Sequence, residues 1–436
     1  MAINVTRDMG RTVTGDVIIV SDVGLTQIAD VSKIVGSLTI SGPNVTSTDL
    51  RELPMLAEVT KGLSLNSLPA LTTLAGLASL SKVGTSLSMH GGPAFVNPAL
   101  PPLLTDLPFL SIVNTGLSDL TGFSGLTHIG LLQLQVVPVG SLDPLRRTFI
   151  DGGVVLNNLS PGLTSLSGLR VSTTLKTVLL GDLPNLTDVT AFDAVTDVDQ
   201  LNLTFPHFST PTLFPSLRKV SQRLDLTLDA QSPSYTFPAL QVVRSLGVSL
   251  FHGCQGRTTP FSLGLPALQT LDDVNWRGPI TSALGCFTLP APLGTLSLNS
   301  AVFFGGGITS VTLAHVQNSG GPNSRGGNIG ISGPDLTQVR FSGSVNINGI
   351  LLINQSPNLR SVSFGGSVTI LAVPQDLNSF GICDNASLTT ITLAAPAQVI
   401  GGMARITGNP NFVPPRNFPL TATGGVIISP TFNARC

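Results

Sequence analysis

The stretch Pro215-Ser216-Leu217-Arg218-Lys219-Val220-Ser221-Gln222-Arg223-Leu224-Asp225-Leu226 decides the fold, because its pattern returns along most of the chain. A proline is followed by any residue, a leucine, two intervening residues and then a valine or leucine. A short strand with alternating apolar residues comes a few positions later. The proline-containing core starts at Pro54, Pro69, Pro108, Pro184, Pro215, Pro238, Pro266, Pro334 and Pro357. So many copies exceed what composition would produce by chance, and the chain is therefore a repeat protein.

The length of the repeat predicts how the copies fold. Strand candidates end about two dozen residues apart, at Leu134, Leu156, Leu180, Leu203, Leu226 and Leu250. A unit this short cannot enclose a core of its own, so it must bury its apolar side against its neighbours. Glutamate occurs only at Glu52 and Glu58, which argues against a helix in every repeat. We therefore expect an all-β fold, a right-handed β-solenoid of leucine-rich coils.

Composition shifts divide the chain into four expected parts. Residues 1–252 carry the regular leucine-rich coils, and residues 253–333 are predicted to be an irregular section with an exposed glycine-rich loop. The solenoid is expected to resume with tighter repeats over 334–409. Residues 410–436 lack the repeat and are predicted to cap the C-terminal end.

Several segments resemble a known family. The strand segments Ile34-Val-Gly-Ser-Leu-Thr-Ile40 and Val83-Gly-Thr-Ser-Leu-Ser-Met89, with the turn Leu68-Pro-Ala-Leu-Thr-Thr-Leu74, are similar to the receptor L-domain, a leucine-rich β-helix. The resemblance covers about residues 10–250 and returns at about 330–395. It implies a protein that binds, adheres or scaffolds at a cell surface, rather than an enzyme.

The weak charge of the chain limits its partners. Charged residues make up 10% of the 436 residues, against about 25% in ordinary domains, and the net charge is −1. Near-zero net charge favours association between molecules. Arg146-Arg147 is the one basic cluster, so nucleic acid is not an expected partner. Neither a signal peptide nor a membrane span is visible in the sequence.

Four cysteines bear on the compartment. Cys254, Cys286, Cys383 and Cys436 could form two disulfides in any of three connectivities, or could be four buried thiols. Their spacing suits no zinc site, and no cofactor or metal is expected. A disulfide-bonded surface fold would place the protein outside the cell, on a cell surface or on a virus particle.

Two groups of residues are candidates for ligand contact. Asp197, Asp199 and Asp225 lie about one coil apart, and stacking would bring Asp197 or Asp199 near Asp225, as glycoside hydrolysis or calcium binding would require. Solvated turn residues are the favoured interpretation of these aspartates, because aspartate is a common turn former. Asp272 and Asp273 lie close to Trp276, whose ring could stack on a sugar; a lone tryptophan is more often a packing residue.

Three functions from different classes remain open. The favoured hypothesis is a non-enzymatic structural or adhesive surface protein that packs laterally with itself or with other surface proteins. The alternative is a recognition module of the L-domain type for a glycan or a protein. The second alternative is a polysaccharide-active β-helix enzyme.

Overall fold

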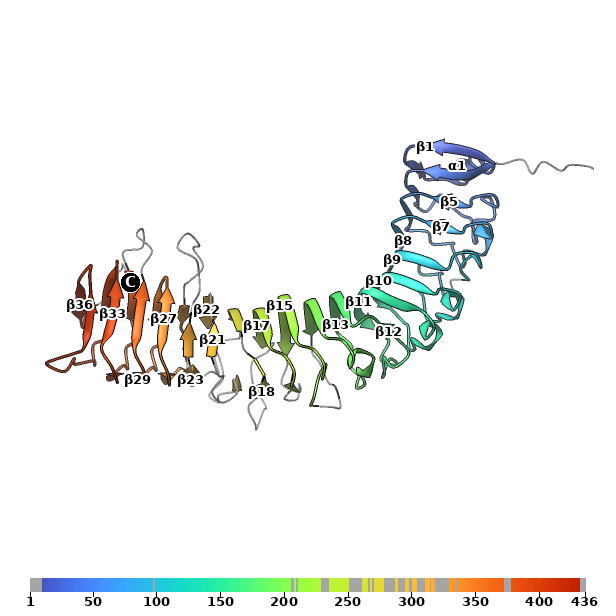
Figure 1. Ribbon diagram of the computed structural model, residues 1–436. Helices are drawn as coiled ribbons and strands as arrows, with labels where there is room; N and C mark the ends of the chain where they lie inside the picture. Colours follow the sequence, from blue (N-terminus) through green and yellow to red (C-terminus); the bar gives the residue numbers. More distant parts are fainter. Residues whose placement is uncertain are drawn as a thin grey trace, which may run out of the picture. The chain divides into compact units, whose positions relative to one another are not determined.

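The computed structural model describes most of the chain. The described residues are 10–96, 99–204, 208, 211–228, 235–250, 261–265, 267–268, 270–277, 287–288, 295–297, 300–303, 310–313, 315–317, 329–334, 336–371 and 378–431. Nearly all of the regular structure of these residues consists of parallel strands in stacked coils, which confirms the β-solenoid (Figure 1). In the described part, helix is confined to α1 (Asp22–Thr26) and four short 3₁₀ turns.

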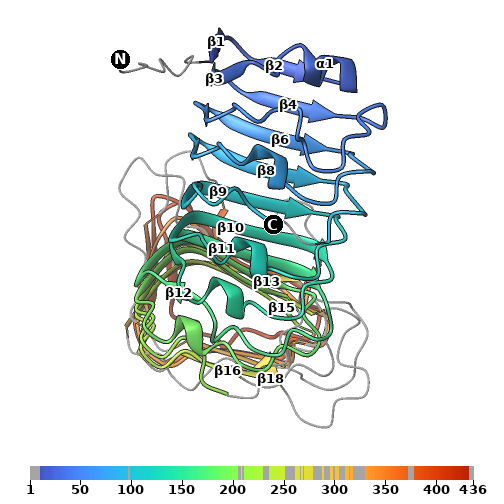
Figure 2. The ribbon, with the colours of Figure 1, turned by 90° about the vertical axis from the view of Figure 1, so that its right-hand side faces the viewer.

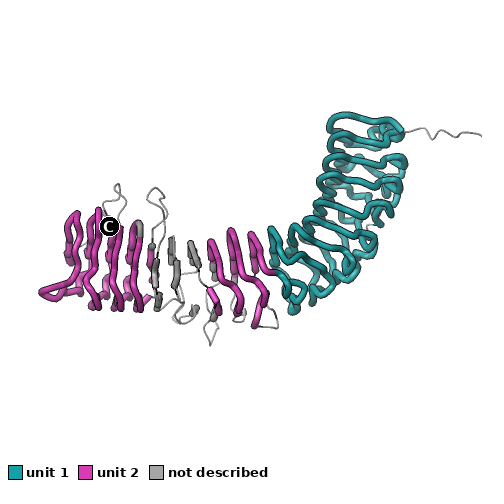
Figure 3. The backbone as a smooth tube through the Cα atoms, in the orientation of Figure 1, with its two compact units in different colours: residues 1–195, 207–209 teal, residues 196–206, 210–436 magenta. Residues whose placement is uncertain are grey.

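The chain forms two compact units, coloured separately in Figure 3. Unit 1 comprises residues 1–195 and 207–209, and unit 2 comprises residues 196–206 and 210–436.

The long sheet of unit 1 has one strand per coil. These strands pair in parallel and in chain order, as the stacked arrows in Figure 2 show. They are β2 (Val17–Ile19), β4 (Leu38–Ser41), β6 (Gly62–Asn66), β8 (Ser86–His90), β9 (Asp106–Val113), β10 (His128–Val137), β11 (Phe149–Leu159) and β13 (Thr174–Gly181).

The other sides of these coils are shorter. A second parallel sheet contains β1 (Arg11–Thr14), β3 (Val31–Val35), β5 (Glu58–Val59) and β7 (Lys82–Val83), and β12 (Arg170–Val171) pairs with β11. Single 3₁₀ turns complete four of the coils: η1 (Ala75–Leu77), η2 (Thr121–Phe123), η3 (Asp143–Leu145) and η4 (Thr190–Phe192).

The alternation of apolar residues in the long strands builds the core. One buried column runs through Leu38, Leu63, Leu87, Leu110, Leu132, Val154 and Val178. A second runs through Ile40, Leu65, Met89, Ile112, Leu134, Leu156 and Leu180. Burying one such side chain is worth about 1.5–3 kcal/mol relative to leaving it exposed, so the columns hold successive coils together.

Glycine follows a valine or isoleucine in several coils, as in Val83-Gly84, and close packing of the coils explains why no larger residue stands there. A Cβ added to Gly84 would lie 2.0 Å from the carbonyl oxygen of Thr60 on the preceding coil. Gly36 and Gly130, at the corresponding places of other coils, meet the carbonyl oxygens of Gly15 and Pro108 at 2.2 Å. The motif therefore marks where the backbones of neighbouring coils approach too closely for any side chain.

Unit 2 begins with long strands and continues with three strands per coil. The main set contains β14 (Asp197–Thr204), β15 (Lys219–Leu228), β17 (Val242–Leu250), β19 (Thr270–Arg277), β22 (Ser300–Phe303), β25 (Ile329–Ile331), β28 (Leu351–Asn354), β31 (Asn378–Cys383), β34 (Met403–Thr407) and β36 (Val426–Ser429). A second set contains β21 (Thr295–Ser297), β24 (His315–Gln317), β27 (Val345–Asn348), β30 (Val368–Leu371), β33 (Ala397–Ile400) and β35 (Leu420–Ala422). A third contains β23 (Ser310–Leu313), β26 (Gln338–Phe341), β29 (Ser361–Phe364) and β32 (Thr390–Leu393). Three short strands, β16 (Tyr235–Thr236), β18 (Phe261–Gly264) and β20 (Phe287–Thr288), form a small sheet of their own.

Parallel stacking also runs through the segments that the sequence predicted to be irregular or capping. Within residues 253–333, β19 pairs with β17 and β22, and β25 continues the stack from β22 to β28. Within residues 410–436, β35 pairs with β33 and β36 pairs with β34. The solenoid is therefore more extensive than the leucine signature alone indicates.

Buried asparagines join the last coils of unit 2. Asn385 is fully buried; its Oδ1 accepts from the backbone N–H of Ser356 at 3.1 Å and its Nδ2 donates to the carbonyl of Ile353 at 3.2 Å. On the next coil Asn409 repeats the arrangement, because its Oδ1 accepts from the N–H of Asn385 at 3.0 Å. These side chains satisfy buried backbone groups where the chain turns between coils.

Candidate functional site

The register of unit 2 places the three candidate carboxylates apart. Asp225 lies opposite Asn202, and Asp197 lies opposite Lys219. Asp225 is therefore displaced from Asp199 by three positions, or about 10 Å along the strands. Neither Asp197 nor Asp199 pairs with Asp225, because paired residues of β14 and β15 are 22 or 23 positions apart in the chain, as in Val198↔Val220 and Asn202↔Asp225.

Two of these carboxylates have polar partners close by. Asp225 Oδ2 forms an ion pair with Arg223 Nε at 2.6 Å, and the Ser221 hydroxyl on the neighbouring coil donates to Asp199. Another aspartate, Asp188 in unit 1, accepts from the N–H of Thr190 at 2.9 Å and from the hydroxyl of Ser165 at 2.6 Å. These hydrogen bonds hold the pKa of Asp188 below its usual value, the bond from Ser165 contributing most.

The Asp188 contact belongs to a recurring turn. In other coils of unit 1, Asp119 accepts from the N–H of Thr121 at 2.8 Å and Ser165 from the N–H of Ser167 at 3.0 Å. A side chain that bonds the backbone two residues later is the usual role of aspartate and serine in turns. This geometry makes Asp119 and Asp188 turn residues, whereas the candidates Asp197, Asp199 and Asp225 lie in the strands β14 and β15.

Asp272, Asp273 and Trp276 lie in β19, and their side chains lie outside the described part. The backbone register aligns Trp276 with Val248 and Phe303. The same column contains Leu226, which is 1% exposed, and Ile331, which is fully buried. A position in this column is typical of a packing residue.

One of the four cysteines falls within the described residues. Cys383 is disulfide-bonded and fully buried, and the hydroxyl of Thr407 lies 3.7 Å from its Sγ. Cys254, Cys286 and Cys436 lie outside the described residues.

Neither a metal cluster nor a membrane helix is found in the described part of the chain. No group of three or more histidine, cysteine, aspartate or glutamate side chains could hold a metal ion there. No helix in the same residues is long and apolar enough to cross a membrane.

Charged residues of unit 1 gather in ladders between coils. Glu58 lies between two lysines, with Lys33 Nζ at 2.7 Å from Oε2 and Lys82 Nζ at 3.0 Å from Oε1. Hydrogen bonds from Lys33 and then Lys82 hold the pKa of Glu58 below its usual value. The three residues pair in register across β3, β5 and β7.

In a second ladder a basic residue lies between two acidic ones. His128 Nδ1 lies 3.2 Å from Asp106 Oδ1, and its Nε2 lies 3.2 Å from Asp151 Oδ1. Partial burial lowers the pKa of His128, but the hydrogen bonds and charges of the two aspartates outweigh burial and raise it overall. This ladder ties three successive coils together.

In the long sheet of unit 1, Asp106, His128, Asp151 and Lys176 lie toward the starts of their strands, and the outward-facing positions farther along the strands carry no Lys, Arg, Asp or Glu. These uncharged positions form two columns that pair in register from coil to coil. The first column is Ile18, Thr39, Ser64, Ser88, Ser111, Gln133, Val155 and Leu179. The second is Ser41, Asn66, His90, Val113, Gln135, Asn157 and Gly181. None of these residues is Lys, Arg, Asp or Glu, and we call the two columns together the neutral face.

Most members of the neutral face are half-buried, as side chains standing on a sheet usually are. Ile18 is the most exposed of the apolar members, at 72%. Ser111 is buried between two neighbours, with its hydroxyl 3.5 Å from His90 Nε2 and 3.4 Å from Gln133 Oε1. The face therefore offers hydroxyl, amide and imidazole groups among apolar side chains. Sequence reasoning missed it because the register between coils decides which residues share a face.

Comparison with known proteins adds a likeness in fold. No protein-family model matches the chain, and no curated protein matches it. Among solved structures, a leucine-rich-repeat protein of Leptospira interrogans is similar, with 14% sequence identity and a TM-score of 0.25. The match covers 68% of this chain and 87% of that protein. It is the coil architecture described above, rather than this match, that makes the chain a leucine-rich-repeat-like β-solenoid.

Proposed function

We propose that the protein is a non-enzymatic structural or adhesive surface protein whose neutral face packs laterally against another copy of the chain. The observation that carries the proposal is the separation of charge in unit 1. Ion pairs gather in the ladders around Glu58 and His128, whereas fifteen aligned positions of the long sheet carry no Lys, Arg, Asp or Glu. Two such faces can approach without like-charge repulsion, and few charges lose their hydration on contact.

The area of the neutral face is large enough for a specific contact of low affinity. Eight coils at about 4.8 Å spacing, with about five strand residues across, give roughly 600 Å² on each partner. The total of about 1,200 Å² lies at the lower limit of standard protein interfaces. A contact of this size gives weak pairs, and assembly then depends on several contacts per molecule.

The setting outside the cell is part of the same proposal. A disulfide at Cys383 supports it, because disulfides persist mainly in oxidising compartments. The strand motif that contains Gly84 supports membership in the receptor L-domain type, whose members bind or scaffold at surfaces. Whether that surface is a cell wall or a virus particle is decided by finding the protein in the purified wall, fibre or particle fraction of its source.

A recognition module for glycans or proteins is the second candidate function. Gln133, Gln135 and Asn157 place half-buried amides on two consecutive coils of the neutral face. Amides both donate and accept hydrogen bonds, so this part of the face could satisfy the hydroxyls of a sugar. Binding of a neutral oligosaccharide by a strictly monomeric protein would favour this candidate.

The enzyme hypothesis has its own test. The double variant Asp197→Asn with Asp225→Asn removes both carboxylates of the expected pair. We expect no polysaccharide cleavage by the wild-type protein and no change in the variant. A cleavage activity that disappears in the double variant would overturn the non-enzymatic proposal.

Light scattering of the purified protein at micromolar concentration and moderate salt tests lateral assembly. The proposal predicts that the mean mass rises with concentration. A particle that stays monomeric over the whole range, and that is also monomeric in its native source, would refute self-assembly.

A further inference from the structure

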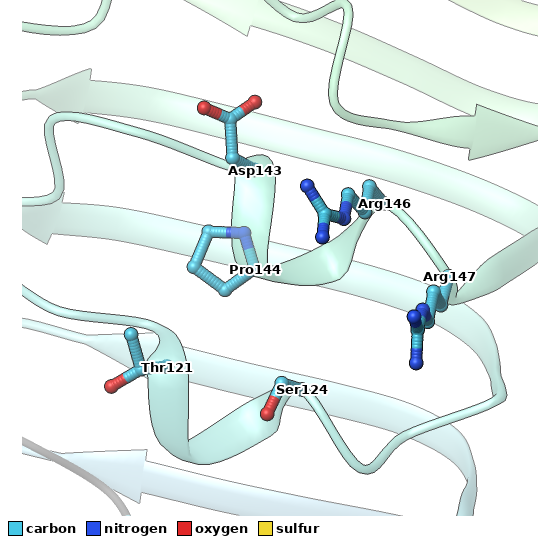
Figure 4. A pocket seen from close by; sticks show the side chains of 6 residues that line it. All are labelled: Thr121, Ser124, Asp143, Pro144, Arg146 and Arg147. Carbon is cyan, nitrogen blue, oxygen red and sulfur yellow. The ribbon is translucent and has the colours of Figure 1, made fainter.

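A groove lies between two successive turns of unit 1, away from the neutral face. It has a volume of about 390 Å³ and is lined by Thr121 and Ser124 of one coil and by Asp143, Pro144, Arg146 and Arg147 of the next (Figure 4). The turns η2 and η3 form its two walls. Arg146-Arg147 is the basic pair that stood out in the sequence and that the strand architecture does not use.

The two arginines are exposed, and no ion pair or hydrogen bond of their side chains is found among the described residues. The carboxylate of Asp143 is directed toward the following coil, since a Cβ on Gly168 of that coil would lie 3.0 Å from Asp143 Oδ1. In Figure 4 this carboxylate points away from Thr121 and Ser124. Both arginines therefore line the groove, while the carboxylate of Asp143 points away from the opposite wall.

The two hydroxyl groups of the opposite wall differ in whether they can donate a hydrogen bond to a ligand. Thr121 donates its hydroxyl proton to Asp119 Oδ2 at 2.6 Å, so it can only accept from a ligand. Ser124 is exposed and can donate. A ligand in the groove thus meets two guanidiniums and one hydroxyl donor, which is a suitable set for one oxyanion.

The fold of the turn does not require arginine at positions 146 and 147. The two positions that follow each 3₁₀ turn hold Ala78-Ser79 after η1, Ser124-Gly125 after η2 and Asp193-Ala194 after η4. In each coil the next residue donates its N–H back to the last residue of the turn, as Leu126 does to Phe123 and Thr148 to Leu145. Small residues therefore suffice for this backbone shape.

We propose that this groove binds the acidic group of a sugar, a carboxylate or sulfate, with Arg146 and Arg147 as the anion-binding residues and Ser124 as a further donor. The groove is larger than a free ion requires, and the ring of Pro144 supplies an apolar wall for the C–H face of a pyranose. A polyanion such as nucleic acid is disfavoured because Asp119 and Asp143 lie beside this single basic pair.

The test is isothermal titration of the full chain with D-glucuronate, glucose 6-sulfate, neutral glucose and inorganic phosphate. We expect an acidic sugar to bind, glucose not to bind, and added salt to weaken the binding. The variant Arg146→Ser with Arg147→Gly copies the sequence Ser124-Gly125, so it should fold as the wild type does by circular dichroism. It should bind the acidic sugar at least tenfold more weakly. Arg170→Ser, an exposed arginine that does not line the groove, is the matched control and should bind as the wild type does.

Three results would overturn the proposal. They are failure of both acidic sugars to bind, binding that is unchanged in the double variant, and binding of phosphate without binding of either acidic sugar.

Discussion

Replacing Asn385 by alanine tests the asparagine ladder of unit 2. The side chain satisfies the N–H of Ser356 and the carbonyl of Ile353, and all three residues are fully buried. Leaving one buried polar group without a partner costs about 1–3 kcal/mol, so the two groups together cost about 2–6 kcal/mol. Taking about 4 kcal/mol as the central value, opening of this coil should become roughly a thousandfold more frequent.

Asn358→Ala is the matched control. Its Nδ2 donates to the carbonyl of Pro334 at 2.8 Å, which is the same kind of coil-to-coil bond, but Asn358 is exposed. Water can replace the lost donor there, so we expect a cost below about 1 kcal/mol. The assay is hydrogen exchange of the peptide that contains β28, because coils of a solenoid open locally. Equal acceleration in the two variants would refute the argument that burial makes the ladder important.

Two further predictions concern unit 1. Gly84→Ala places a Cβ 2.0 Å from a carbonyl oxygen of the preceding coil and should lower the melting temperature of the protein. Gly125→Ala, whose Cβ meets nothing within 4 Å, should lower it much less. Equal decreases in melting temperature would contradict the close approach of the coils at Gly84. The pKa of His128 is raised above its ordinary value of 6.5, so its stabilising contribution is fully present below that pH and is lost as the pH rises through the folded-state pKa. His128→Gln should remove this pH dependence of urea unfolding between about pH 5.5 and 8.5, and an unchanged profile would contradict a charged imidazole between its two aspartates.

The sequence predicted the solenoid because its dominant signal, an alternation of leucines every two dozen residues, is also the dominant packing feature. Leu63 and Leu65 are buried in separate columns, as the alternation requires. The strands between residues 253 and 333 escaped prediction because Trp276 and Phe303 occupy a column that holds Leu226 and Ile331 in other coils. Packing in a column selects for apolar bulk, so the leucine signature can disappear while the strand remains.

The candidate site was less predictable for a different reason. Contacts between side chains of neighbouring coils depend on register, and a single irregularity near Asp199 moves every later pair. Asp225 therefore lies beside Asn202. The neutral face and the charge ladders depend on the same register, and both became visible only once the coils were aligned.

The most direct test of the proposed assembly is sedimentation velocity of two variants with the same change in charge. Ser64→Lys with Ser88→Lys places two ammonium groups on adjacent coils of the neutral face, where they would face the second copy of the chain. Ala75→Lys with Ala78→Lys places the same charge at two exposed positions, in η1 and directly after it, outside the two columns. We expect the first variant to stay monomeric at concentrations where the wild type and the second variant associate. Association of the first variant at wild-type strength would contradict it.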